Sequence, residues 1–178
     1  AYIYDYTGKM VKQVTQGDWE ITEIVGVDEA ENWLYFYGKL DSPMEQQIYR
    51  VKLDGAGLTK ISAQAGWHTP IFSPDFKYFI DTYSNTTIPP KTILNKSDGG
   101  LIQVIDEGEM EAWTGRDIVY PEFQTVTTDD GVELNAYLLK PANFDPQKKY
   151  PVLVYGYGGP GSQKVVNRWK DYRDNWHQ

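Results

Sequence analysis

Residues 150–163 read YPVLVYGYGGPGSQ, and the interpretation of the whole chain depends on this stretch. Its first part, from Val152 to Tyr155, is a β-branched and aromatic run that predicts a strand buried on both faces. Glycines at 156, 158, 159 and 161 then predict a sharp turn with a close backbone approach. Inside that turn, Tyr157 can donate a hydrogen bond into a cleft, as an oxyanion requires. The glycine spacing alone favours a tight turn whose tyrosine packs on a neighbour.

The chain before this stretch repeats. Between residues 1 and 108, alternating apolar runs joined by glycine-containing turns recur about every 45 residues, at 3–15, 48–62 and 92–105. Further strand pairs are predicted between these hairpins, at 22–37 and 69–83. Four strands per repeat of about this length is the spacing of a β-propeller blade. An unrelated sandwich would show frequent turns but no such register.

The repeat is too short to close a ring, since a propeller needs at least about four blades, and we therefore expect the chain to be part of a larger protein. After residue 108 the repeat stops, an Asp-Gly hairpin is predicted around 123–139, and the stretch at 150–163 follows. The predicted fold class is mainly β. It comprises the last blades of a propeller (1–108), a connector (109–120) and the first strands of an α/β-hydrolase domain (121–178).

Composition excludes several functions. A net charge of −8 and a pI near 4.7 would repel phosphate backbones, so no nucleic-acid partner is expected. The longest apolar run is too short to span a membrane. No cofactor is expected because the glycine loop matches neither phosphate-binding fingerprint. The absence of cysteine and the scattered histidines and carboxylates predict no metal site.

The sequence resembles the prolyl oligopeptidase family of serine peptidases, and most closely its dipeptidyl peptidase IV branch. The motifs that carry the resemblance are Gly17-Asp18-Trp19-Glu20, Asp98-Gly99-Gly100 through Glu107, Lys149-Tyr150-Pro151 with the glycine loop, and Gly161-Ser162-Gln163. The resemblance implies a propeller followed by an α/β-hydrolase domain, and an exopeptidase that releases Xaa-Pro dipeptides by acyl transfer. It also implies that Tyr157 donates to the oxyanion.

The departures from the family decide what this chain can do. No serine lies in a G-x-S-x-G pentapeptide, and in the family the position of Ser162 is structural. We interpret His68 as a satisfied structural residue and His177 as part of a polar tail. Without nucleophile, acid and base, the chain alone is predicted to be inactive. Three acidic residues alternate at the beginning of the connector and are interpreted as a solvated patch: Glu107, Glu109 and Glu111.

Two alternatives remain open from the sequence. One is a non-catalytic propeller module that binds peptide or glycan; the other is an oligopeptidase or acylaminoacyl peptidase of the same family. Under the main hypothesis the partner is a peptide substrate. The resemblance favours an extracytoplasmic location and a homodimeric parent, although the residues themselves decide neither.

Overall fold

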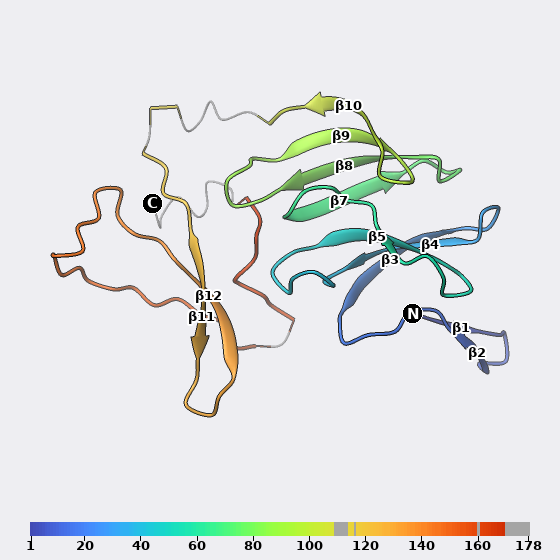
Figure 1. Ribbon diagram of the computed structural model, residues 1–178, viewed down its shortest axis with the longest axis horizontal. Helices are drawn as coiled ribbons and strands as arrows, with labels where there is room; N and C mark the ends of the chain where they lie inside the picture. The colour runs from blue at the N-terminus through green and yellow to red at the C-terminus, as the bar shows by residue number, and fades with distance from the viewer. Residues whose placement is uncertain (109–113, 116, 160, 170–178) are drawn as a thin grey trace.

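The computed structural model describes residues 1–108, 114–115, 117–159 and 161–169, and all regular structure in these ranges is β (Figure 1). None of it is a helix long and apolar enough to cross a membrane. The strands are β1 (Tyr2–Tyr4), β2 (Met10–Gln13), β3 (Ile21–Asp28), β4 (Trp33–Gly38), β5 (Gln47–Lys52), β6 (Thr59–Lys60), β7 (Trp67–Phe72), β8 (Tyr78–Ser84), β9 (Lys91–Lys96), β10 (Leu101–Asp106), β11 (Glu122–Thr127) and β12 (Glu133–Leu138).

Two four-stranded antiparallel sheets form the centre of the molecule. One has the order β3-β4-β5-β6 and the other β10-β9-β8-β7, so each strand pairs with its neighbour in sequence. In Figure 1 the two sheets stand next to each other, and the β1–β2 hairpin lies beside the first. The predicted repeat of four-stranded antiparallel units is confirmed, and we call the two sheets the first and the second blade.

Buried apolar side chains form two clusters, one centred on the first blade and one shared by the two blades. In β8 every second residue points inward, so that Phe79, Asp81 and Tyr83 are buried. β4, at the centre of the first blade, is buried along almost its whole length. There Phe36 stacks between Trp19 and Tyr49, with ring centroids 5.9 Å and 5.7 Å apart. Aromatic pairs at this spacing add to the gain from burying their area.

Aromatic side chains also join the two blades. Tyr35 of the first blade contacts Phe72 and Phe76 of the second, at centroid distances of 4.7 Å and 5.3 Å. The ring of Phe76 reaches β3 at Gly26, where an added Cβ would lie 2.5 Å from a ring carbon. Only glycine leaves this space, so the inter-blade contact depends on its missing side chain.

Backbone hydrogen bonds cross the same junction. The amide of Gln46 donates to the carbonyl of Gly66 at 3.1 Å, and the amide of His68 donates to the carbonyl of Gln46 at 3.0 Å. Together they make a parallel bridge between Gln46 and Trp67. The beginnings of β5 and β7 are therefore held side by side.

The β11–β12 hairpin forms a separate two-stranded sheet, as the Asp-Gly turn predicts. Its register runs without a bulge from Glu122 opposite Leu138 to Thr127 opposite Glu133. Gly131 has a φ of 85°, a conformation that favours glycine. In Figure 1 this hairpin stands apart from both blades.

The buried strand expected after residue 150 is not present. Residues 151–158 form no strand, and the side chains of Val152 and Val154 are 79% and 88% exposed. A strand buried on both faces needs neighbouring strands and a covering layer, which the apolar run cannot supply itself. Within the described ranges no strand pairs with it.

We predict that Phe79→Ala lowers the free energy of unfolding by about 3–5 kcal/mol, because it leaves a cavity in the apolar cluster between the two blades. Phe79 is 1% exposed and its ring packs on Phe72 at 4.8 Å. The matched control is Ile71→Ala in the same blade, whose side chain is 72% exposed, with an expected change within about 0.5 kcal/mol. Urea unfolding of both variants measures the difference, and similar losses would contradict the assigned core.

Candidate functional site

The loop at residues 156–159 carries Tyr157 on the surface of the molecule. Its side chain is 59% exposed, and its ring lies over Gly159. An added Cβ at Gly159 would lie 2.7 Å from the tyrosine hydroxyl, so this ring position requires the small residue. The ammonium of Lys164 lies 5.3 Å from the ring centroid, within the range of a cation–π contact. Tyr157 is thus an exposed residue with a hydroxyl that can donate to a bound group.

Residues beyond the loop attach it to the first blade. The side-chain amide of Gln163 donates to the carbonyl of Pro43 at 2.7 Å, and its oxygen accepts from the ammonium of Lys39 at 3.0 Å. In Figure 1 the red segment that contains Gln163 runs between the blades and the β11–β12 hairpin. Ser162 is half-buried in the same segment.

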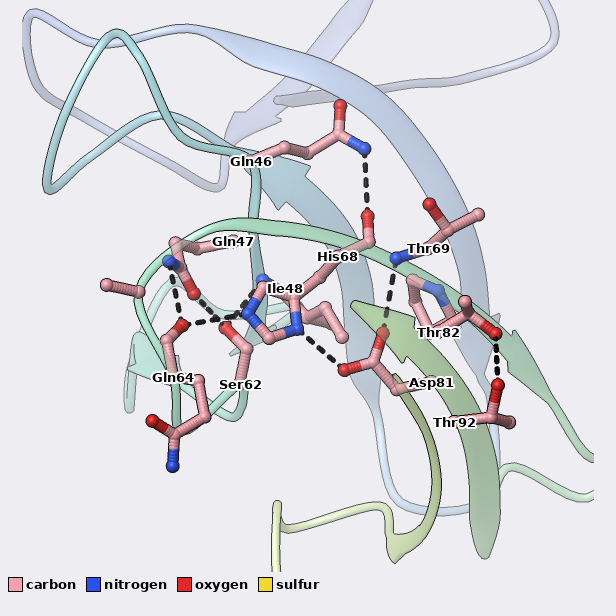
Figure 2. Close-up of polar contacts among 12 residues, drawn as sticks. Gln46, Gln47, Ile48, Ser62, Gln64, His68, Thr69, Asp81, Thr82 and Thr92 are labelled. Carbon is pink, nitrogen blue, oxygen red and sulfur yellow. Dashed lines mark hydrogen bonds and ion pairs between the residues drawn. The ribbon is translucent and has the colours of Figure 1, made fainter. Parts of the chain in front are cut away.

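His68 lies in the junction of the blades with both ring nitrogens hydrogen-bonded (Figure 2). Nδ1 lies 2.6 Å from Oδ2 of Asp81, and Nε2 lies 2.8 Å from the carbonyl oxygen of Gln64. Both side chains of the pair are 1% exposed. Oδ1 of Asp81 accepts from the amide of Thr69 at 3.1 Å, and the imidazole stacks on Tyr83 at 5.2 Å.

This geometry makes the histidine structural. The carbonyl oxygen of Gln64 can only accept, so Nε2 donates to it, and Nδ1 lies against the carboxylate of Asp81. A catalytic histidine directs one ring nitrogen at a nucleophile, whereas His68 uses both for buried partners. The interpretation of His68 as a satisfied structural residue is confirmed.

The nearby Ser62 has a similar structural role. Its hydroxyl donates to the side-chain oxygen of Gln47 at 2.5 Å and accepts from the amide of Ile48 at 3.0 Å. All three groups are buried, and Figure 2 shows them beside Gln64. Buried polar groups that satisfy one another in this way fix the loop that leads from β6 to β7.

Of the other acidic and basic candidates, only Glu107 lies within the described residues. Glu107 is exposed and pairs with Lys91 at 2.5 Å; its contact raises the pKa of the lysine. Glu109, Glu111 and His177 lie outside the described residues. Among the residues that are described, no group of three or more histidines and carboxylates could hold a metal ion.

Sequence reasoning missed Asp81 as the partner of His68, although a signal for it exists. Asp81 occupies an inward position of β8, between Phe79 and Tyr83, and His68 occupies an inward position of β7. A charged residue at an inward position of an alternating strand must find a partner, because burying it alone is costly. When two paired strands each carry such a residue at an inward position, the two residues are expected to be hydrogen-bond partners.

The comparison with protein families matches residues 1–90, about half of the chain, to the family described as "Dipeptidyl peptidase IV (DPP IV) N-terminal region". A probable dipeptidyl-aminopeptidase B from Botryotinia fuckeliana is 37% identical over 159 residues, which is 85% of this chain and 17% of that protein. A protein of the same description from Trichophyton verrucosum is 34% identical over 176 residues, 95% of this chain and 20% of its own length. The chain therefore spans about a fifth of the length of these relatives.

Solved structures show the same likeness. The dipeptidyl peptidase 4 of Porphyromonas gingivalis superposes with a TM-score of 0.88 and 32% identity, over 97% of this chain and 25% of that chain. A putative dipeptidyl aminopeptidase IV from Bacteroides ovatus gives a TM-score of 0.81 and 28% identity, over 93% and 24%.

We predict that Asp81→Ala lowers the free energy of unfolding by about 3–5 kcal/mol, because it leaves His68 buried without its charged partner. Asp81→Asn should cost less than half as much. The amide can still accept from Thr69 and can donate to Nδ1 of a neutral imidazole, so no buried group stays unpaired. Urea unfolding compares the two variants, and equal losses would contradict this account.

Proposed function

Because this chain belongs to the dipeptidyl peptidase IV family, we propose that it is part of a longer serine peptidase that releases N-terminal Xaa-Pro dipeptides from peptides by acyl transfer. The names of its relatives support a peptidase that removes dipeptides. The observation that carries the proposal within the chain is the exposed Tyr157 in a glycine loop. A propeller that only binds ligands does not require such a loop.

The proposed division of the chain follows its change of pattern. Residues 1–108 are the last part of a β-propeller, 109–120 connect the two domains, and 121–178 begin an α/β-hydrolase domain. The hairpin β11–β12 and the apolar run at 151–155 would then be the first strands of the hydrolase sheet. This assignment accounts for the exposed apolar side chains of the run, since the rest of that sheet would cover them.

Tyr157 is the proposed donor to the oxyanion. In acyl transfer the carbonyl oxygen of the scissile bond gains negative charge, and a donor that is already in place stabilises it in the transition state. A phenol at the surface of a loop can reach a substrate without displacing other side chains. Gly159 contributes by leaving space for the ring.

The nucleophile, its base and the orienting carboxylate would come from other parts of the longer protein. The chain has no G-x-S-x-G pentapeptide, which is where this fold carries its serine. Ser62 lies in the loop from β6 to β7, and Ser162 follows the glycine loop. We therefore assign the chain the propeller wall, the connector and one oxyanion donor.

In the longer protein, Tyr157→Phe should lower kcat by about 10²–10³-fold and leave KM nearly unchanged, because the lost hydrogen bond acts mainly in the transition state. The assay uses a Gly-Pro chromogenic amide with a free N-terminus. The matched control is Tyr6→Phe, at the exposed turn of the β1–β2 hairpin, which should leave both constants unchanged.

The same assay tests the substrate class. Gly-Pro amides should be cleaved well with a free N-terminus, and poorly when the N-terminus is blocked or alanine replaces proline. Equal cleavage of blocked substrates would move the assignment to an oligopeptidase. Full activity of Tyr157→Phe would remove the tyrosine from the catalytic machinery.

The chain of residues 1–178 by itself should not hydrolyse the Gly-Pro amide above the buffer rate, because it lacks the pentapeptide of the nucleophile. The purified chain is assayed beside the longer protein at equal molar concentration. Turnover that follows the concentration of the purified chain would contradict the proposed origin of the nucleophile.

A further inference from the structure

Asn167 joins both blades to the segment that follows the Tyr157 loop. Its backbone amide donates to the carbonyl of Met44 at 2.8 Å, and its side-chain nitrogen donates to Oε1 of Glu45 at 2.8 Å. Its side-chain oxygen accepts from the amide of Thr86 at 3.1 Å and from the Thr86 hydroxyl at 3.4 Å. Met44 and Glu45 precede β5 of the first blade, and Thr86 follows β8 of the second.

The chemistry of this position suits asparagine. One short side chain presents a donor to Glu45 and an acceptor to Thr86, which is the donor–acceptor pair of a carboxamide. An aspartate would place a second carboxylate against Glu45, and an alanine would leave the partners on both blades without their contact. The side chain is half-buried, so water replaces these contacts only in part.

The acceptor on the first blade is itself fixed by a buried network. Oε2 of Glu45 accepts from the side-chain nitrogen of Gln47 at 2.8 Å. That nitrogen also donates to the carbonyl of Gln64 at 3.1 Å, which is the same oxygen that accepts from His68. Figure 2 shows Gln47, Gln64 and His68 converging on this point. Asn167 therefore contacts a carboxylate whose position the blade junction has already set.

The segment has further contacts on both sides of Asn167. Toward the loop, Gln163 binds Lys39 and the Pro43 carbonyl, and Lys164 lies beside the ring of Tyr157. On the other side, the amide of Trp169 donates to the hydroxyl of Ser84 at 3.2 Å. Contacts with Tyr157 or with a blade therefore recur along the segment, at Gln163, Lys164, Asn167 and Trp169.

We propose that Asn167 is a positioning residue: by binding the first blade and the second blade at once, it sets the place of the loop that carries Tyr157. This inference rests on the proposed function of Tyr157. Asn167 does not touch the substrate, and it affects the reaction only through the position of Tyr157. A shift of about 1 Å in a reacting group can cost about a hundredfold in rate.

The first test measures kcat and KM of the longer protein with Asn167→Ala, Tyr157→Phe and both changes together. We expect Asn167→Ala to lower kcat about 10–100-fold with little change in KM. In the Tyr157→Phe background the same change should have no further effect, because the group that it positions is already lost. The matched control is Asn135→Ala on β12, an exposed asparagine, which should leave kcat unchanged.

The second test exchanges the donor and the acceptor. Asn167→Asp should lower kcat, because two carboxylates then face each other. Adding Glu45→Gln should restore it: the new amide nitrogen donates to the carboxylate introduced at position 167, its oxygen accepts from Gln47, and the net charge is that of the parent. Thermal unfolding of each variant is recorded, so that the rescue is compared among folded proteins.

The outcomes are distinguishable. If Tyr157→Phe lowers kcat but Asn167→Ala does not, or if the two losses multiply, the positioning role is overturned and the proposed function stands. A double variant Asn167→Asp with Glu45→Gln that is no better than Asn167→Asp alone also overturns it. If Tyr157→Phe keeps full activity, the proposed function fails, and the positioning role fails with it.

Discussion

The buried polar junction of the two blades is the constraint on which the arrangement of this chain depends. His68 and Asp81 are shielded from water, so each needs a partner of opposite character at hydrogen-bond distance. The shared acceptor, the carbonyl of Gln64, also holds Gln47. The rings of Tyr35 and Phe76 add an aromatic contact between the blades. Together these contacts join the two β-meanders at one junction.

The strands and their turns could be predicted from the sequence because the contacts that form them are local. The hairpin around Asp54 and Gly55 follows from alternation and one turn, and its register is set by residues close in sequence. The apolar run from Val152 to Tyr155 shows the limit of the same reasoning. Its composition predicts burial, but burial depends on neighbours that no local pattern can provide.

The candidate site likewise has one part that the sequence predicts and one part that it does not. Tyr157 is predicted as a site residue from the glycines around it, and in the structure it lies at the surface. The contacts of Asn167 carry no such signal, because they join residues 81 and 122 positions apart. No spacing or periodicity links Asn167 to Glu45 or Thr86. Only the assembled blades bring them together.

The sheet order has a consequence for how the chain folds. In each blade every strand pairs with the next one along the chain, so the loops that must close are short and pairing is fast. The segment with Asn167 has its complete binding surface only when both blades exist and have met, because its contacts with Glu45 and Thr86 lie on different blades. The complete attachment of this segment is therefore a late step in folding. An ordered loop in this position indicates that both blades have already formed. A nascent chain with one misfolded blade would keep the tyrosine loop unplaced.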